Sequence, residues 1–211
     1  MEETPLEAEQ VDAALRAAGV GRPPPVTAAL TAFVNLLSRW NRVYNLTGTG
    51  GNRHLVERHL VESLALEPLI QGTRVADVGS GGGFPGIPLA ISAPERRFTL
   101  IESRAKRARF LRHAVATLGL ANATVAHSRA EDLRGEAPFD TVLARAVASP
   151  PKLLEIVRAL TAPGGIVLVL TSAERAASFE RAGGGFTHRP APPGAARLES
   201  AIVVLERNAT H

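Results

Sequence analysis

A glycine-rich stretch from Val75 to Leu89 constrains the fold of this chain more than any other segment. It reads Val-Ala-Asp-Val-Gly-Ser-Gly-Gly-Gly-Phe-Pro-Gly-Ile-Pro-Leu, a short apolar run followed by five glycines within eight residues. Glycine allows positive φ angles and a close approach of the backbone to another group. Pro85 and Pro88 fit the first turn of a helix, whose free N–H groups favour a polar or anionic ligand. The stretch therefore predicts a strand, a tight turn and a helix start, with a ligand against the turn.

The next apolar run provides an acid at a favourable place. It spans Arg97 to Ile101 and is followed by Glu102, 25 residues after Asp77. An acid at such a strand end hydrogen-bonds a ribose hydroxyl in nucleotide-binding folds. We therefore expect a ligand that carries a nucleoside, with Asp77 at the mouth of the loop, placed for an ammonium group or a bound water. The alternative is a plain connector and an accidental carboxylate.

Composition limits the class of protein. A chain of 211 residues with 45% apolar content suits one domain of ordinary size with an N-terminal elaboration. The absence of cysteine excludes disulfides, thiolate metal sites and cysteine nucleophiles. The first ten residues are acidic and polar, and no apolar run approaches the length of a membrane span. We expect a cytoplasmic protein with no membrane partner.

The charge permits a nucleic-acid partner. Lysine accounts for two of the 24 Lys and Arg residues, so 22 are arginine, and the net charge is +4 with a sequence pI near 10.5. Such a balance allows RNA binding without establishing it. Basic residues between 104 and 112 fall mostly off the apolar stripe of a predicted helix, which favours a solvated face over an RNA patch.

The pattern of apolar residues predicts two regions. Residues 1–70 carry helical periodicity at 6–18, 26–44 and 53–67, with Trp40 and Tyr44 on a buried stripe and Gly48 as the end of the second helix. Residues 71–211 predict one compact unit in which strands at 74–78, 97–101, 123–127, 139–144 and 166–170 alternate with helices that include 104–118 and 152–160. The fold class is therefore α/β, with helices on both faces of a parallel sheet. A strand at 200–205 and an edge strand after residue 185 predict a terminal antiparallel hairpin, which makes the sheet seven-stranded and mostly parallel.

Ligands of doubly wound sheets bind outside the carboxyl ends of the strands. This rule selects the residues that follow the predicted strands: Asp77 to Phe84 with the loop glycines Gly79, Gly81 and Gly83, then Glu102, Ser128 to Asp132, Arg145, and Thr171 with Ser172. Of these, Glu102 is expected to bind a ribose, and Ala130 and Glu131 to line a base. We expect one connected pocket.

A Pro-Gly-Gly turn before the fifth strand, together with the glycine-rich loop, looks like the Rossmann-like class I methyltransferases that use S-adenosylmethionine. An NAD-dependent oxidoreductase fits less well. The phosphate-binding Gly-x-Gly-x-x-Gly is replaced here by Gly79-Ser-Gly-Gly-Gly-Phe84.

Six ordered motifs between about residues 30 and 170 resemble one family within this class, RsmG (GidB). They are Arg39-Trp-Asn-Arg-Val-Tyr-Asn-Leu-Thr47, His59-Leu-Val-Glu-Ser-Leu64, Asp77-Val-Gly-Ser-Gly-Gly-Gly-Phe-Pro-Gly-Ile-Pro88, Glu102-Ser-Arg-Ala-Lys-Arg-Ala-Arg-Phe-Leu111, Ser128-Arg-Ala-Glu131 and Ala144-Arg-Ala-Val147. Members of this family are bacterial rRNA methyltransferases that act on N7 of a guanosine in the decoding region of 16S ribosomal RNA. The resemblance implies the same activity here, with 16S ribosomal RNA or the small ribosomal subunit as partner and a monomeric enzyme.

The resemblance also assigns site residues. It places cofactor contacts on Gly79, Phe84, Ala130, Glu131 and Arg145, while Asp77 and Glu102 follow from the fold, and it makes Asn45 and Arg145 candidates to meet the RNA. Two departures bear on the RNA side. Thr171-Ser172 stands where the family often has a lysine, and the loop 48–52 is unusually rich in glycine.

The implied reaction needs few catalytic side chains. N7 of neutral guanine has a free lone pair and no proton, so attack on a sulfonium methyl needs orientation and no general base. Four scattered histidines, at 54, 59, 113 and 127, form no ligand pattern within one element, so we expect no metal. Open alternatives are a methyltransferase for another RNA or a small molecule, and a nucleoside-binding regulator without catalysis.

Overall fold

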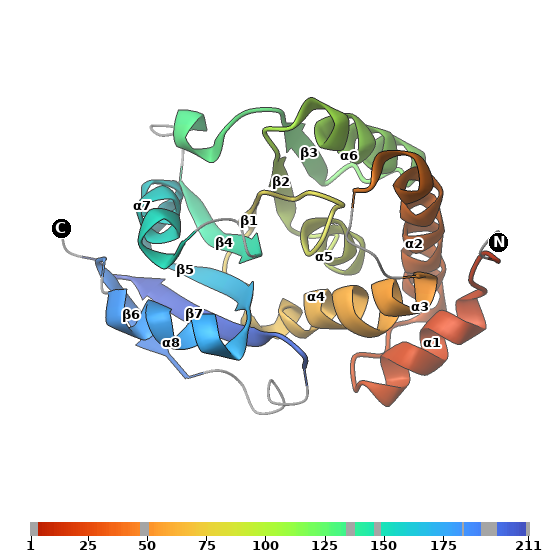
Figure 1. The fold of residues 1–211 in the computed structure, drawn as a ribbon, viewed down its shortest axis with the longest axis horizontal. Coiled ribbons are helices and arrows are strands. Elements are labelled where there is room, and N and C mark those ends of the chain that lie inside the picture. The colour runs from red at the N-terminus through yellow and green to blue at the C-terminus, as the bar shows by residue number, and fades with distance from the viewer. Residues whose placement is uncertain are drawn as a thin grey trace.

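The computed structural model describes residues 4–46, 51–133, 138–145, 149–182, 184–190 and 198–209. The helical N-terminal part comprises α1 (Ala8–Ala17), α2 (Pro24–Tyr44), α3 (Asn52–His54), the π-helical η1 (Leu55–Leu60), α4 (Val61–Ala65) and the 3₁₀ turn η2 (Glu67–Leu69). Strands and helices then alternate: β1 (Arg74–Val78), α5 (Gly86–Ser92), β2 (Arg97–Ile101), α6 (Ala105–Thr117), β3 (Ala123–Ala126), η3 (Ala130–Leu133), β4 (Phe139–Arg145), α7 (Pro150–Leu160), β5 (Thr161–Thr171), α8 (Ala173–Ala182), β6 (Phe186–Arg189) and β7 (Ala201–Arg207) (Figure 1).

The strands form one seven-stranded sheet in the order β3-β2-β1-β4-β5-β7-β6. The first five strands pair in parallel, and β7 pairs antiparallel with both β5 and β6. This confirms the predicted α/β class, the mostly parallel sheet and the antiparallel hairpin at its end. The helix α8 between β5 and β6 was not predicted from the sequence.

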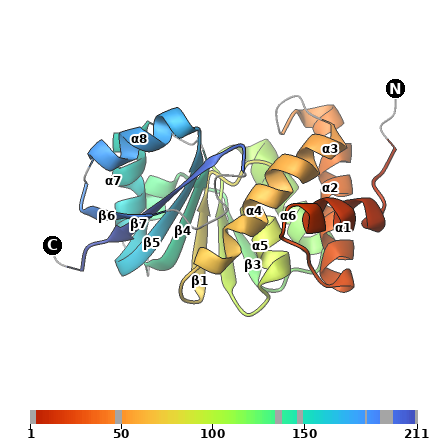
Figure 2. The same cartoon turned by 90° about the horizontal axis from the view of Figure 1, so that it is seen from below.

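Helices cover both faces of the sheet (Figure 2). On one face, α7 and α8 pack on alternate strand residues such as Ala76, Val78 and Val142. On the other face, α5 and η2 cover Val75 and Leu143. Outside this layer, α2 packs on both α5 and α6, and α1 packs on α2. The N-terminal helices therefore share a core with the helices that follow the first two strands.

The N-terminal helices differ from the prediction in two ways. The third helix is interrupted by the π-helical turn η1, which periodicity does not reveal. The second helix ends at Tyr44, where Asn45 takes a left-handed conformation (φ 47°), and the expected stop at Gly48 lies outside the described residues. The expectation that Tyr44 is buried is wrong: the residue is the last of α2 and is 42% exposed. Trp40 packs, partly buried, against the core as expected.

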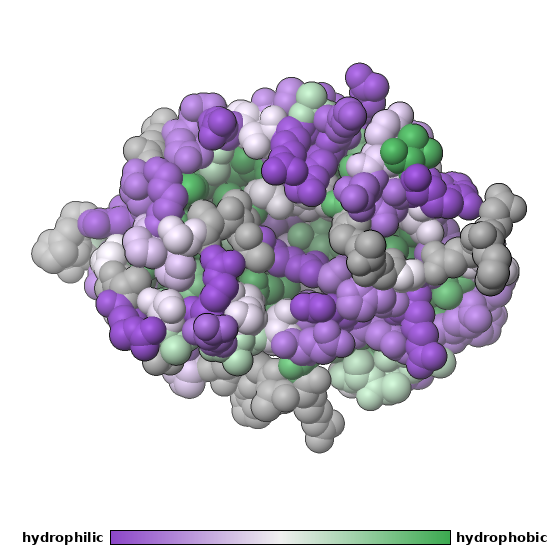
Figure 3. Space-filling model, in the orientation of Figure 1, coloured by the Kyte–Doolittle hydropathy of each residue, from purple (hydrophilic) through white to green (hydrophobic). Residues whose placement is uncertain are grey.

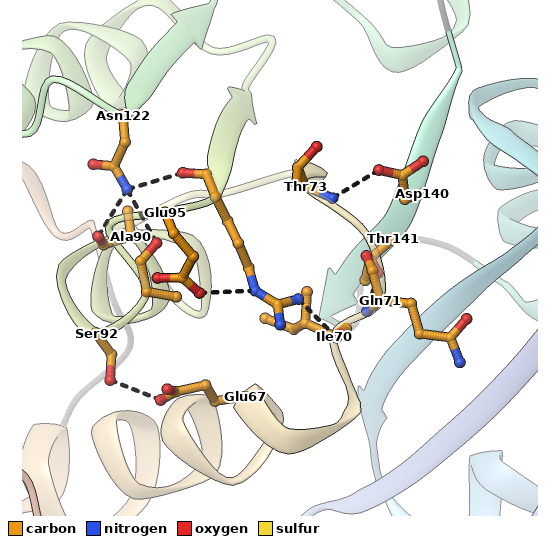
Figure 4. Close-up of polar contacts among 12 residues, drawn as sticks. Glu67, Ile70, Gln71, Thr73, Ala90, Ser92, Glu95, Asn122, Asp140 and Thr141 are labelled. Carbon is orange, nitrogen blue, oxygen red and sulfur yellow. Dashed lines mark hydrogen bonds and ion pairs between the residues drawn. The ribbon is translucent and has the colours of Figure 1, made fainter.

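A network of polar contacts ties the amino ends of the strands together (Figure 4). The Asp140 carboxylate accepts hydrogen bonds from the backbone N–H groups of Thr73 and Arg74, which fixes the start of β1 beside β4. The side-chain amide of Asn122 donates to the carbonyl groups of Ala90 and Arg96, which fixes the entry to β3 beside α5. These contacts lie at the end of the sheet opposite the predicted ligand edge, so they hold the fold without occupying that edge.

The fifth strand is longer than predicted. It begins at Thr161 and carries an irregularity, because Thr161 pairs with Phe139 whereas Ile166 pairs with Thr141. A Cβ atom at Gly165 would lie 2.8 Å from the carbonyl oxygen of Asp140, so glycine is required where the chain passes this strand. The predicted Pro-Gly-Gly turn is therefore a bulge within the strand.

Candidate active site at the carboxyl edge of the sheet

The glycine-rich loop folds over the end of β2. The N–H groups of Gly79 and Ser80 both donate to the carbonyl oxygen of Ile101, at 2.9 and 3.1 Å. Three loop glycines have positive φ angles, which side chains with a Cβ rarely adopt: Gly79 (71°), Gly81 (56°) and Gly83 (91°). A Cβ at Gly81 would lie at ordinary contact distance, 3.6 and 3.7 Å, from the carbonyl oxygen of Gly79 and Nη1 of Arg107. The predicted tight turn is confirmed, although Gly81, Gly82 and Gly83 are buried and Gly79 is partly exposed.

Asp77 lies under the loop and is almost fully buried, with 1% exposed. Its Oδ2 accepts the N–H of Gly86 at 3.0 Å, which anchors the start of α5. Its Oδ1 is buried and has no hydrogen-bond partner among the described residues. Burial raises the pKa of Asp77 to about 6, while the nearby Ser80 hydroxyl, the N–H of Gly86 and the charge of Arg145 act in the opposite direction. An orphaned acceptor at this place is suited to a donor group of a ligand.

Glu102 supports the same loop from β2. Its Oε2 accepts the N–H of Gly81 at 3.0 Å and its Oε1 accepts the N–H of Arg104 at 2.8 Å. Each carboxylate oxygen has a second acceptor site, so these bonds leave capacity for ligand hydroxyl groups. The side chain is therefore a loop anchor as well as the predicted ribose acceptor, a structural role that its strand-end position alone does not reveal.

Phe84 closes the loop on its helical side. It is 4% exposed, and its ring lies edge to face with Phe33 of α2 at a centroid distance of 5.2 Å. The ring of His59 lies 5.4 Å from it. A Cβ atom at Gly83 would come within 3.1 Å of the Phe33 ring. The loop is thus seated on the N-terminal helices, a contact that the spacing of residues around Phe84 does not predict.

Arg145 ends β4 and reaches the N-terminal helices. Its Nη2 lies 2.5 Å from Nδ1 of His59 in η1. Burial, and then the positive charge of Arg145, lowers the pKa of His59 to about 3, so the imidazole is neutral at physiological pH. Burial lowers the pKa of Arg145 as well, which the negative charges of Glu62 and Asp77 counteract. A guanidinium donates, so Nδ1 of His59 accepts this bond and Nε2 carries the proton.

The other predicted residues lie at different depths. Ala130 begins η3 and is 7% exposed, and Glu131 beside it is half-buried. Near them, Ser128 has a buried hydroxyl with no hydrogen-bond partner in the described part of the chain. Asn45 lies apart: it is exposed at the end of α2, where its N–H donates to Asn41, and no hydrogen bond between described residues joins it to Arg145.

The structure thus brings together Asp77, the glycine loop, Glu102 and Arg145, and it adds His59 and Phe33. Sequence reasoning counted His59 among scattered histidines and Phe33 among core residues, although His59 opens one of the quoted motifs. In the described ranges no group of three or more His, Asp or Glu side chains gathers in a way that would hold a metal ion. Within the same ranges no helix is both long and apolar enough to cross a membrane.

Solved structures share the fold. The chain superimposes on cofactor-bound Rv0187 from MTB with a TM-score of 0.61, 20% identity and complete coverage of both chains. It also superimposes on the T. thermophilus 16S rRNA N2 G1207 methyltransferase in complex with AdoMet and guanosine, with a TM-score of 0.53 and 19% identity over 71% of this chain and 43% of that one. At these identities the likeness shows the class I methyltransferase fold.

Sequence comparisons identify the family. Residues 26–183 match the family model GidB, described as rRNA small subunit methyltransferase G. Ribosomal RNA small subunit methyltransferase G of Aromatoleum aromaticum is 39% identical over 96% of this chain and its own full length. The protein of the same name from Pseudomonas syringae is 44% identical over 69% of this chain and 68% of its own. The chain therefore belongs to the rRNA small subunit methyltransferase G (GidB) family.

Proposed function

We propose that this protein transfers a methyl group from S-adenosylmethionine to N7 of a guanosine in 16S ribosomal RNA of the small subunit. The observation that carries the proposal is the juxtaposition, at one sheet edge, of the tight glycine loop, the orphaned buried oxygen of Asp77 and the guanidinium of Arg145. Family membership supports the reaction, and the fold of the AdoMet-bound neighbour supports the cofactor.

The residues present fit S-adenosylmethionine. The unpaired Oδ1 of Asp77 matches the ammonium group of its amino-acid part, and the remaining acceptor sites of Glu102 match its ribose hydroxyls. The backbone of the loop from Gly79 to Phe84 would lie against its central part. Ala130 and Glu131 would line the base. When bound, the cofactor supplies a methyl group on positively charged sulfur.

The chain's own contribution to the reaction is orientation. Guanine N7 is already nucleophilic, so the protein must align it in line with the methyl group and exclude water. Arg145 is held in place by the neutral imidazole of His59, which does not neutralise the positive charge of the guanidinium. We propose that this guanidinium contacts guanine O6 or a neighbouring phosphate. Asn45, at the end of α2, is proposed as a second RNA contact apart from the residues around Asp77 and Arg145.

The test of the reaction is transfer of labelled methyl groups to small ribosomal subunits from cells that lack the gene. We expect incorporation at one guanosine, mapped as N7-methylguanosine in the decoding region. Naked 16S RNA and small ribosomal subunits are assayed in parallel to determine which form of the substrate the enzyme prefers. Cofactor binding without any incorporation into either substrate would contradict the proposed reaction and leave the cofactor site standing.

The test of the cofactor site is Asp77→Asn, followed by calorimetry with S-adenosylmethionine. The amide has the size of the carboxyl group and its oxygen still accepts the N–H of Gly86, so the fold is expected to persist. It presents a donor where Oδ1 was, so affinity is expected to fall about tenfold to a hundredfold, as for a lost charge-assisted hydrogen bond. Unchanged affinity would remove Asp77 from the binding site.

We also propose the setting in which the protein works. Residues 1–70 form a helical segment that shapes the RNA-facing side, and residues 71–211 form the methyltransferase unit; the shared core of α2, α5 and α6 supports their action as one body. A monomer that acts in the cytoplasm without a membrane fits a ribosomal substrate. Light scattering and fractionation of cells test these points.

A further inference from the structure

An exposed aromatic ring stands at the junction of α2 and α6. The ring of Tyr44 lies 5.2 Å from that of Trp40, with an angle of 36° between the planes. Trp40 is held from the other side by Phe110 and His113 of α6, at centroid distances of 5.5 and 5.3 Å. Tyr44 is 42% exposed although its ring rests on this support. The arrangement is a fixed ring with a free surface.

Apolar exposure continues beside the ring. Val43 is 72% exposed, and Val43 and Tyr44 are the two large hydrophobic residues exposed in the described part of the chain. In Figure 3 a small strongly hydrophobic area stands out among hydrophilic side chains over the end of α2. Single exposed apolar residues are ordinary on protein surfaces, whereas contiguous ones mark interaction sites. The joint exposure of Val43 and Tyr44 therefore indicates an interaction site.

Cations border the ring on the α6 side. Lys106 and Arg109 each lie four residues before a residue that touches Trp40, namely Phe110 and His113, so they occupy the same helix face one turn earlier. Lys106, Arg109 and the neighbouring Arg112 are exposed. No carboxylate of the described residues forms an ion pair with any of the three. We call Val43, Tyr44, Lys106, Arg109 and Arg112 the α2–α6 surface.

This surface borders the site. The helix α6 begins three residues after Glu102, which anchors the loop. The guanidinium of Arg107, in the first turn of α6, lies 3.7 Å from the place a Cβ of Gly81 would occupy. A polymer whose nucleotide enters the site from the carboxyl edge therefore meets the first turns of α6 and the end of α2 directly.

We propose that the α2–α6 surface binds single-stranded ribosomal RNA next to the target guanosine, with one base stacked on Tyr44 and phosphates against Lys106 and Arg109. This inference rests on the proposed function and adds the place where the substrate is held. An aromatic ring combined with a track of unpaired cations is the usual arrangement for single strands, since stacking and phosphate neutralisation do not require a particular sequence. It revises two expectations from the sequence, that Tyr44 is core and that the α6 cations are merely solvated.

The first test compares Tyr44→Ala with Tyr44→Phe in methyl transfer to small subunits that lack the modification. Loss of the ring is expected to raise KM for the subunits about tenfold, the effect of one lost base stack, and to leave the affinity for S-adenosylhomocysteine unchanged. Tyr44→Phe keeps the ring and is expected to behave like the parent protein. A KM of Tyr44→Ala equal to that of the parent protein would overturn the stacking role. So would a rise in KM in Tyr44→Phe as large as that in Tyr44→Ala.

The second test uses Trp40, the single tryptophan of the chain, as a reporter. Its fluorescence is expected to change when a short single-stranded RNA with the decoding-region sequence is added, and to stay constant with S-adenosylhomocysteine alone. Replacing Arg109 and Lys106 by Gln is expected to lower the slope of log affinity against log salt by about 1.4, or about 0.7 per phosphate contact. An unchanged slope would overturn the phosphate role.

The outcomes distinguish a failure of the α2–α6 surface from a failure of the proposed function. If the parent protein methylates no substrate and binds no RNA, the proposed function fails. If the parent protein is active and the Tyr44 and Lys106/Arg109 variants match it in KM and salt slope, the function stands and the α2–α6 surface is not the RNA site.

Discussion

Arg145 and His59, 86 residues apart in the chain, meet through a hydrogen bond of 2.5 Å from Nη2 to Nδ1. One residue ends the central strand β4, and the other lies in the π-helical turn of the N-terminal part. The contact fixes the direction of the cation that we propose orients the guanine. It also couples the helical segment to the chemistry of the sheet edge.

Replacing Arg145 tests that coupling. Arg145→Ala is expected to reduce single-turnover methyl transfer by about a hundredfold or more, since a misplaced reacting group costs that much. Arg145→Lys keeps the charge but loses the planar fork of donors, so we expect only partial recovery. The measurement is labelled methyl incorporation into small subunits, with S-adenosylhomocysteine calorimetry beside it. If both rate and cofactor affinity stay at the parent level in Arg145→Ala, the assigned role is refuted.

His59 predicts a dependence of stability on acid. Its folded-state pKa is about 3 against an ordinary value of 6.5, so below pH 6.5 the unfolded chain binds a proton that the folded chain excludes. The free energy of unfolding should therefore decrease as the pH falls from 6.5 toward 3. Asp77, with a pKa raised from 3.8 to about 6, acts in the opposite direction, because its folded form holds a proton there that the unfolded form has released.

Urea unfolding between pH 4 and 7 measures the sum, and variants separate the two groups. In His59→Gln the loss of stability toward low pH should be smaller than in the parent protein. In Asp77→Asn it should be larger. A His59→Gln profile that follows the parent profile throughout would show that the imidazole is not buried in its neutral form.

Gly86 tests how closely the loop and α5 are packed. A Cβ there would lie 2.4 Å from Cδ2 of Leu100 and 2.6 Å from Oδ2 of Asp77. Gly86→Ala is expected to cost about 1–3 kcal/mol of stability through overpacking, and to weaken binding of S-adenosylhomocysteine because Asp77 must move. Gly119→Ala is the control without overpacking, since nothing lies within 4 Å of a Cβ there and only its positive φ (64°) strains a side chain. It should lose stability and keep full affinity.

Phe33 tests the seat of the loop on α2. The side chain is fully buried against Phe84, so Phe33→Ala is expected to cost about 3–5 kcal/mol of unfolding free energy. Phe33→Leu leaves a smaller cavity and should fold well enough for binding assays. We expect its affinity for S-adenosylhomocysteine to fall while that of Leu15→Val, a buried change at α1, stays at the parent value. Equal affinities in the two variants would mean that the loop does not depend on this contact.

Much of the site at the carboxyl edge of the sheet could be predicted from the sequence, because its residues belong to short local motifs. The strand before Gly79, the acid at the end of β2 and the alternation of later elements each follow from residues close together in the chain. The position of Arg145 at the same edge follows from parallel pairing of β1 and β4. Fold class, sheet type and family were therefore predicted from patterns and motifs.

The features that were missed depend on contacts between distant segments. Nothing in the periodicity around His59 distinguishes a π-helical turn from an α-helical one, and its contact with Arg145 exists only after the helices pack on α5. Tyr44 has the same three- and four-residue spacing as the buried residues before it, yet it is the last residue of α2 and is 42% exposed. Exposure at a helix end is decided by where the neighbouring helix lies, which the stripe itself does not contain.

The π-helical turn η1 changes the direction in which the side chains of the third helix point after it. Ahead of its end, His59 faces Arg145; just beyond it, Glu62 faces the start of β7, where its Oε1 accepts the N–H of Ser200 at 3.0 Å. Each residue of an α-helix advances the azimuth by about 100°, so removing one residue from η1 would rotate one of these two side chains out of register with its target. The single π-helical turn thus allows His59 to contact Arg145 while Glu62 contacts the C-terminal hairpin, and a change in its length would break one of these two contacts.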